Sequence, residues 1–167
     1  MLERLPYPSK IGLAALLGSG ALLGGAYYFQ YVEGLAPCDL CFWQRYPHMV
    51  AVAAGVLAVA SLAWPRLASI FAVTAIIALF VTAGIGVYHT GVELHLWAGP
   101  QTCAGRIPPG LPPAELKKFL FSARMVRCDE AAWKFLDISM AGWNALLSGA
   151  LALLLTSRVS VHLRTQS

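Results

Sequence analysis

Residues 67–88 read LASIFAVTAIIALFVTAGIGVY, contain no charged side chain and decide the class of fold. A helix needs about 20 mainly apolar residues to cross the roughly 30 Å hydrocarbon layer of a membrane. This stretch is long enough, so it predicts a membrane-spanning helix. Of the 167 residues in the chain, 58% are hydrophobic and 12% are charged. A soluble domain carries about 25% charged residues, so we expect a polytopic membrane protein.

Three further apolar stretches, residues 11–30, 46–64 and 138–156, have spanning length. The first exceeds the apolar core of a cleaved signal peptide, which is about 7–15 residues long, and we interpret it as a retained helix. The second is separated from residues 67–88 by a turn at Pro65, so these two helices form a tight hairpin. The sequence therefore predicts an all-α membrane protein, a single four-transmembrane-helix bundle with outer loops at 31–45 and 89–137.

The outer loop over 89–137 combines a stretch rich in proline and glycine with a segment of helical periodicity. Prolines and glycines crowd residues 99–113 and exclude regular structure there. Beyond them, Leu116, Phe119 and Leu120 recur at helical spacing beside lysines. We expect a short amphipathic helix over 115–125 that lies on the membrane surface.

Charge and cysteine placement give the same orientation for the bundle. The two tails and the turn after the second stretch hold five basic residues and one acidic residue: Arg4, Lys10, Arg66, Arg158 and Arg164 against Glu3. Because cytoplasmic loops carry an excess of Lys and Arg, we expect both termini in the cytoplasm. All four cysteines then lie on the opposite side, where an oxidising environment lets disulfides persist.

Composition and spacing exclude three classes of site. The net charge of +4 is modest and no basic stripe alternates with aromatic residues, so we expect no nucleic-acid partner. A zinc site built from cysteines needs a second close pair, but Cys103 and Cys128 lie far apart in sequence. A c-type haem needs histidine directly after the second cysteine of a CxxC, where this chain has Phe42. We therefore expect no metal.

Residues 37–45, PCDLCFWQR, place Cys38 and Cys41 in a CxxC pair, the smallest unit of thiol–disulfide chemistry. A disulfide at this spacing constrains the unfolded chain little, so it is a poor staple and a better redox centre. Four cysteines allow three pairings, and a bridge between Cys103 and Cys128 would serve as a staple or as a mobile carrier. The alternative to redox chemistry is a small scaffold or partner-binding protein with two structural disulfides.

Three polar residues near the CxxC pair are candidate site residues. Arg45 lies one helical turn beyond Cys41, where it either reaches lipid headgroups or stabilises a thiolate or an anionic cofactor. Gln44 can donate a hydrogen bond to the same acceptor. His89, at the end of the third stretch, is either a proton donor, as quinone reduction requires, or a cap at the negative end of the helix.

The string PCDLCFWQR resembles the signature of the DsbB family of disulfide-bond formation membrane proteins, P-C-x-L-C-x-x-Q-R, at every fixed position. The predicted spans, the second cysteine pair and the histidine are similar to the family layout. The family reoxidises DsbA, a periplasmic thioredoxin-fold oxidase, and passes the electrons to membrane quinone. The resemblance implies a dithiol:quinone oxidoreductase of the bacterial inner membrane that uses ubiquinone or menaquinone.

The resemblance also implies roles for the four cysteines. Cys38 and Cys41 would form the disulfide next to the quinone. Cys103 and Cys128 would form the pair that meets the DsbA-like partner, which would attack Cys103. The helix over 115–125 resembles the membrane-lying helix of the family.

The remaining site residues implied by the resemblance bind the quinone: Arg45, Gln44 and His89. Arg45 would support both the quinone and the thiolate beside it.

A further alternative is an enzyme of this kind running in the reducing direction, with electrons taken from a quinol.

Overall fold

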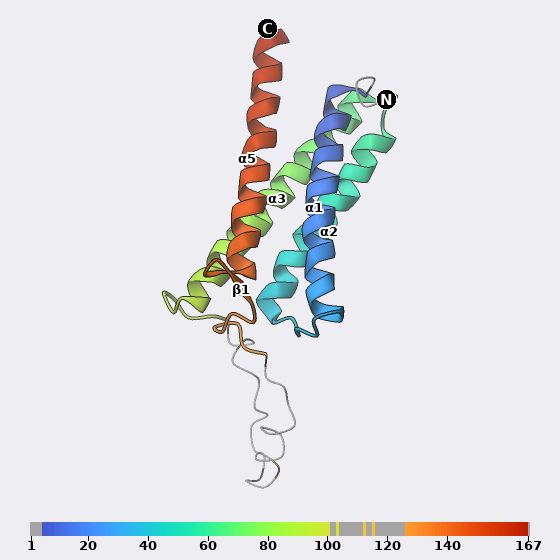
Figure 1. Cartoon of the computed structure of the whole chain (residues 1–167). Helices are drawn as coiled ribbons and strands as arrows, with labels where there is room; N and C mark the ends of the chain where they lie inside the picture. Colours follow the sequence, from blue (N-terminus) through green and yellow to red (C-terminus); the bar gives the residue numbers. More distant parts are fainter. Residues whose placement is uncertain (1–4, 101–102, 104–111, 113–114, 116–125, 167) are drawn as a thin grey trace.

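The computed structural model describes residues 5–100, 103, 112, 115 and 126–166, and this part of the chain contains four long helices (Figure 1). The helices are α1 (Tyr7–Tyr31), α2 (Asp39–Ala60), α3 (Pro65–Glu93) and α5 (Met140–Gln166). Two short strands, β1 (Lys134–Phe135) and β2 (Ile138–Ser139), pair as an antiparallel hairpin. Apart from Glu115, the helix expected over 115–125 lies outside the described residues.

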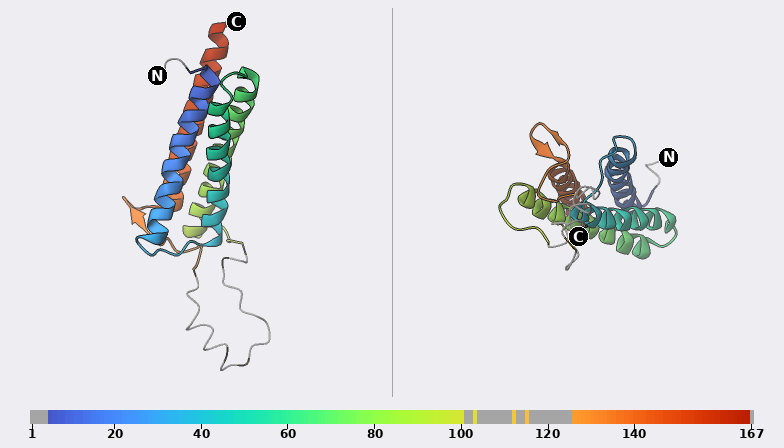
Figure 2. Two further views of the ribbon diagram at one scale, coloured as in Figure 1. Left: turned by 90° about the vertical axis from the view of Figure 1, so that its right-hand side faces the viewer. Right: turned by 90° about the horizontal axis from the view of Figure 1, so that it is seen from below.

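The helices run alongside one another, and both ends of the chain lie at the same end of the bundle (Figure 1). Helix α2 packs on both α1 and α3, and α3 packs on α5. Helices α1 and α5 make few contacts with each other, although both border the same side of the bundle (Figure 2). The connection between α1 and α2 lies at the end opposite the termini, and so do residues 94–100 and 126–139 between α3 and α5 (Figure 1).

Three of the described helices, α1, α3 and α5, are long and apolar enough to cross a membrane. They confirm three of the four expected spans as helices. Helix α2 is less apolar because its first half carries a group of polar residues: Asp39, Gln44, Arg45 and His48. Its crossing of the membrane stays a prediction.

The expected start of the second helix, residue 46, is wrong because α2 begins at Asp39. Cys38 is the N-cap, and its Sγ accepts a hydrogen bond from the backbone N–H of Cys41 at 3.3 Å. Asp39 in the first turn places a negative charge at the positive end of the helix. The reactive motif therefore lies on the first turns of a helix and not in the loop expected over 31–45.

Helix α3 extends beyond its expected end at residue 88 and ends at Glu93, which leaves His89 inside the helix. The chain then folds back along α3. The indole N–H of Trp97 donates to the carbonyl of Tyr88 at 2.8 Å, and the Tyr88 hydroxyl donates to the carbonyl of Ala98 at 3.0 Å. These bonds hold the start of the long loop against the end of the helix.

Helix α5 begins at Met140, slightly after the expected start of the fourth helix at residue 138. Residues 138–139 form β2, and the turn before them has positive φ angles of 51° at Leu136 and 60° at Asp137. Two such residues in a row suit the tight turn of a two-residue hairpin. The Trp143 indole N–H donates to the Phe135 carbonyl at 3.1 Å and ties this hairpin to α5, which begins at Met140.

Small residues set the distance between α1 and α2. A Cβ atom added at Gly55 would lie 2.6 Å from the carbonyl oxygen of Gly12. Near the other end of this contact, the Ser9 hydroxyl donates to the Ala58 carbonyl at 3.0 Å. In lipid, where burial of apolar surface gives little drive, such close backbone approach supplies much of the packing energy.

We expect Gly55→Ala to lower the Tm of the protein in detergent. The added methyl group overlaps the backbone of α1, and overpacking of this kind costs about 1–3 kcal/mol. Gly84→Ala is the control because a Cβ at Gly84 meets nothing within 4 Å. An equal Tm for the two variants would show that the α1–α2 contact is looser than the structure has it.

Candidate active site

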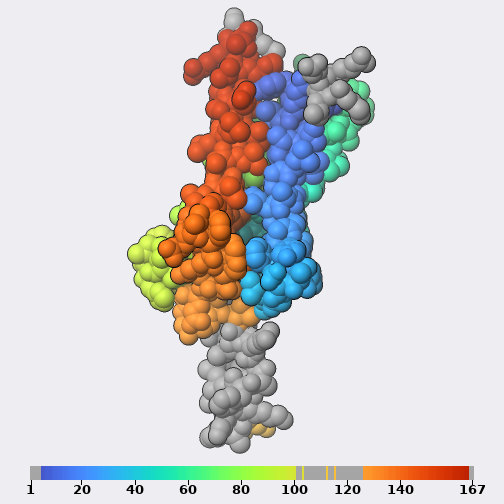
Figure 3. Space-filling view, in the orientation of Figure 1, coloured from blue at the N-terminus to red at the C-terminus, as the bar shows by residue number. Residues whose placement is uncertain are grey.

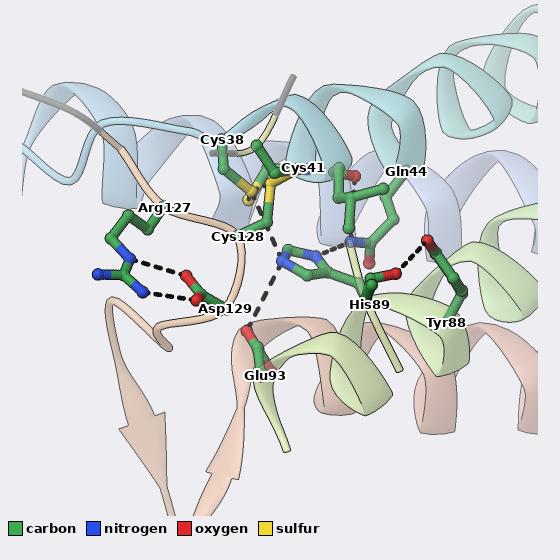
Figure 4. The surroundings of a disulfide bond; sticks show 12 residues. Cys38, Cys41, Gln44, Tyr88, His89, Glu93, Arg127, Cys128 and Asp129 are labelled. Carbon is green, nitrogen blue, oxygen red and sulfur yellow. Dashed lines mark hydrogen bonds and ion pairs between the residues drawn. A yellow bond between two sulfur atoms is a disulfide. The ribbon is translucent and has the colours of Figure 1, made fainter. Parts of the chain in front are cut away.

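The four cysteines gather at the end of the bundle away from the termini. Cys38 and Cys41 are free thiols with their Sγ atoms 2.8 Å apart, whereas Cys103 and Cys128 form a disulfide with a Cα–Cα distance of 5.3 Å. Cys38, Cys103 and Cys128 belong to one buried cluster, against which Cys41 packs. Figure 4 shows Cys128 beside the CxxC pair, and we call the four cysteine side chains the sulfur cluster. The two predicted cysteine pairs therefore lie next to each other.

His89 lies against the first cysteine of the motif. Its Nε2 is 3.5 Å from the Sγ of Cys38 and 3.8 Å from a carboxylate oxygen of Glu93. Its Nδ1 is 2.7 Å from the side-chain nitrogen of Gln44, and the residue is only 3% exposed. Figure 4 shows the ring between these three side chains. His89 thus lies against Cys38 from within α3.

Arg45 turns toward α1 and is only 7% exposed. Its guanidinium donates to the Ala26 carbonyl at 3.2 Å and to the side-chain oxygen of Gln30. The rings of Tyr27 and Phe42 lie 5.1 and 5.3 Å from its central carbon. The interpretation of Arg45 as a headgroup ligand does not fit this burial. Because these partners are neutral, they leave a buried positive charge that is available to an anion.

A pocket of about 420 Å³ lies between α1, α5, the start of α2 and the β-hairpin. One wall carries polar and reactive groups from α2: Cys41, Gln44, Arg45 and His48. The rest is mainly apolar, and Figure 3 shows a hollow between α1 and α5. The pocket therefore brings an apolar space, a thiol and a buried cation together.

Aromatic side chains that the sequence analysis did not select form the outer wall of this pocket. Trp133 packs on Phe29 and Phe135 with ring centroids 4.8 and 6.1 Å apart, and Phe135 lies 6.1 Å from Trp143. Two of these residues precede or form the hairpin, which has no periodic signal in the sequence. Their position depends on contacts with α1 and α5.

A second set of residues missed by the sequence analysis forms a buried polar network around Asn144 of α5. The Asn144 side-chain nitrogen donates to Oε1 of Gln44 at 2.7 Å and to the hydroxyl of Thr82 at 3.1 Å. Its oxygen lies 2.8 Å from Nε2 of His48 and accepts from the Ser148 hydroxyl at 3.0 Å. A polar residue inside an apolar helix was the available signal, since such residues usually face the bundle interior.

Comparison with known proteins agrees with this geometry. The family model described as "Disulfide bond formation protein DsbB" matches residues 8–157. The chain belongs to the DsbB family. It is a membrane protein of disulfide-bond formation and a thiol–disulfide oxidoreductase of the inner membrane.

Curated relatives in this family cover most of the chain. A disulfide bond formation protein B from Stutzerimonas stutzeri is 33% identical over 153 residues, which cover 86% of this chain and 89% of the relative. One from Nitrosococcus oceani is 36% identical over 132 residues, 74% of each chain. One from Azoarcus sp. is 31% identical over 156 residues, 85% of this chain and 86% of the relative. No solved structure matches the chain.

The two thiols of the DsbB motif have different environments. The hydrogen bond to the sulfur of Cys41 and, secondarily, burial raise the pKa of the Cys38 thiol above its usual range. Cys38 is therefore less acidic than an ordinary thiol when the pair is reduced. Cys41 faces the pocket and is the sulfur that is open to reaction.

We expect iodoacetamide to modify Cys41 of the reduced protein first and to modify Cys38 only at strongly alkaline pH. The thiolate is the reactive form, and a raised pKa moves its formation to higher pH. Mass spectrometry of the alkylated peptides against pH measures both sites. In Cys41→Ala, which removes the hydrogen-bonding sulfur, modification of Cys38 should begin at lower pH. An unchanged pH profile in this variant would contradict the assigned cause.

Proposed function

We propose that this protein is a dithiol:quinone oxidoreductase that reoxidises a periplasmic DsbA-like oxidase and passes the electrons to ubiquinone or menaquinone. The observation that carries this proposal is the pocket beside Cys41 and Arg45. Its volume of about 420 Å³ is within the range of small-ligand sites, roughly 300–1,000 Å³. Its position between α1 and α5, which make few contacts with each other, gives a lipid-soluble ring a lateral route in.

The residues that line the pocket fit a quinone. Flat aromatic side chains on the hairpin and α5 suit a planar ring, and the apolar wall of α1 suits its isoprenoid tail. A bound quinone supplies a two-electron, two-proton acceptor. Arg45 would stabilise negative charge on its oxygen and on the Cys41 sulfur, since its other described partners are neutral. Gln44 lines the same wall, although its two donor hydrogens serve Leu40 and His89.

The first half of the electron path uses the outer disulfide. A thiolate of the partner attacks Cys103, the bond between partner and Cys103 forms, and the electron pair of the Cys103–Cys128 bond leaves on Cys128. The second partner thiolate then displaces Cys103, so the partner gains a disulfide and this pair is reduced. DsbA is a strong oxidant at about −120 mV, so a stronger final acceptor such as quinone is required.

The second half passes the electrons inward. The Cys128 thiolate attacks Cys38 of an oxidised CxxC pair, and the electron pair leaves on Cys41. The Cys103 thiolate then attacks Cys128, which restores the outer disulfide and leaves the second pair on Cys38. This is the distribution in the structure, with a Cys103–Cys128 disulfide and free Cys38 and Cys41. Closing the Cys38–Cys41 bond delivers two electrons and two protons to the quinone.

The proposed topology has four spans, with both termini in the cytoplasm and the sulfur cluster in the periplasm. Both ends of the chain lie at one end of the bundle, and the four cysteines lie at the other (Figure 1). The basic residues of the tails and of the turn at Arg66 favour the cytoplasmic side for the first end. The end with the cysteines fits the periplasm, because disulfides persist in that oxidising compartment.

We expect Cys38→Ser to abolish partner-driven loss of quinone absorbance while a mixed disulfide with the partner still forms at Cys103. The change removes the inner pair and leaves the outer pair intact. The assay mixes purified protein, a short-chain quinone and a reduced thioredoxin-fold oxidase. If the protein were a scaffold, neither the wild-type protein nor Cys38→Ser would cause quinone loss. An enzyme of the reducing direction would instead gain thiols when the oxidised protein is mixed with quinol.

We expect Gly25→Leu to raise the KM for quinone about tenfold, the equivalent of about 1.4 kcal/mol of lost binding. Gly25 lines the pocket, and a Cβ there meets nothing within 4 Å, so the new side chain enters the space of the ligand. Gly24→Leu is the control. It is the adjacent position on α1, equally open, and does not line the pocket. Equal KM values for both variants would place the quinone elsewhere.

A further inference from the structure

Two backbone carbonyls fix the direction of every hydrogen bond between Asn144 and the sulfur cluster. The Asn144 side-chain nitrogen lies 3.3 Å from the carbonyl oxygen of Thr82, which can only accept. This end of the amide is therefore the NH₂ group, and the oxygen end faces His48 and Ser148. The same NH₂ group donates to Oε1 of Gln44 at 2.7 Å.

The direction then passes from Gln44 to His89. The NH₂ group of Gln44 lies 3.3 Å from the carbonyl oxygen of Leu40 and 2.7 Å from Nδ1 of His89. An amide NH₂ has only donors, so Nδ1 accepts, and the neutral ring carries its proton on Nε2. A carboxylate oxygen of Glu93 lies 3.8 Å from that nitrogen and favours a proton there.

We propose that Asn144 is a positioning residue of the redox site: through Gln44 it holds His89 in the Nε2–H tautomer, aimed at the sulfur of Cys38. His89 is then a hydrogen-bond donor to Cys38, with the two atoms 3.5 Å apart. His89, Gln44 and Cys38 are all buried, so little water competes for these bonds. The amide of Asn144 acts at a distance, since it contacts no sulfur in the described residues.

This role rests on the proposed electron path, in which Cys38 becomes a leaving group. When the Cys103 thiolate attacks Cys128, the Cys103–Cys128 bond forms and the Cys38–Cys128 bond breaks. The electron pair leaves on Cys38, next to the N–H of His89. A hydrogen bond to this sulfur lowers the basicity of the leaving thiolate, and a less basic thiolate leaves faster.

The same tautomer argues against a metal at this cluster. The ligand atoms of Cys38, Cys41 and His89 lie within 4.8 Å of one another, a spacing that a metal ion can share. Binding would need a free lone pair on Nε2, but the bond from Gln44 puts the proton there. Thiol chemistry therefore suits this histidine better than metal binding does.

Nitrogen NMR of the reduced protein with ¹⁵N-labelled histidine tests the proposal directly. Protonated and unprotonated ring nitrogens have well-separated shifts, and the loss of a signal in His89→Gln assigns the residue. At a pH where the ring is neutral, the wild-type protein should show His89 protonated on Nε2. The tautomer is read from the wild-type protein itself, and His89→Gln serves only to assign its signal.

Asn144→Asp tests the positioning step. An aspartate keeps the size and the acceptors of Asn144 but has no NH₂ group, so a carboxylate oxygen would face Oε1 of Gln44 across the 2.7 Å contact. This repulsion should outweigh the longer 3.3 Å bond from Gln44 to the Leu40 carbonyl, so Gln44 should turn its amide over and present oxygen to His89. The His89 proton should then move to Nδ1, and exchange between the cysteine pairs should slow about tenfold, as expected for the loss of one hydrogen bond to a leaving thiolate. Ser148→Ala is the control because it removes a bond only on the other side of the Asn144 amide.

A wild-type His89 protonated on Nδ1, or an Asn144→Asp protein that keeps the proton on Nε2, would overturn the proposal. So would an equal tautomer change in Ser148→Ala. The NMR experiment contains neither quinone nor partner. A protein that shows the expected tautomers but reduces no quinone would therefore refute the electron path and leave the positioning of His89 standing.

Discussion

The hydrogen bond from the backbone N–H of Cys41 to the sulfur of Cys38 starts α2 at the reactive motif, and the site depends on it. Because the helix begins there, Cys41, Gln44, Arg45 and His48 lie at helical spacings of three and four residues and share one face. A start at residue 46 would leave Cys41, Gln44 and Arg45 on a loop with no fixed geometry. The N-cap thus converts a short sequence motif into one wall of a pocket.

A second constraint is that polar groups inside a membrane protein need partners within the bundle. Asn144 meets this need for α2, α3 and α5 at once, through Gln44, Thr82 and His48. The buried charge of Arg45 is held by α1 in a similar way, with neutral partners. Together these bonds hold the helices around the pocket and connect its floor to the sulfur cluster.

Much of the fold was predictable because a membrane demands long apolar helices, and a stretch such as residues 67–88 is recognised by its length and lack of charge. The CxxC pair, Arg45 and His89 were predictable from residue type and spacing near the ends of those stretches. The hairpin before α5 was not, because strands of two residues are stabilised by contacts such as Trp143 to Phe135. Nor was the bond between His48 and Asn144, which are separated by 96 positions and meet only once the bundle forms.

The central claim is that the CxxC pair itself reduces quinone, and a single turnover without a partner tests it most directly. Reduced protein is mixed with one equivalent of a short-chain quinone, and quinol and the Cys38–Cys41 disulfide are both counted over time. The account predicts that they appear at the same rate and in equal amounts, and that neither appears in Cys41→Ser. Quinol that forms in Cys41→Ser, or a disulfide that closes without quinol, would contradict it.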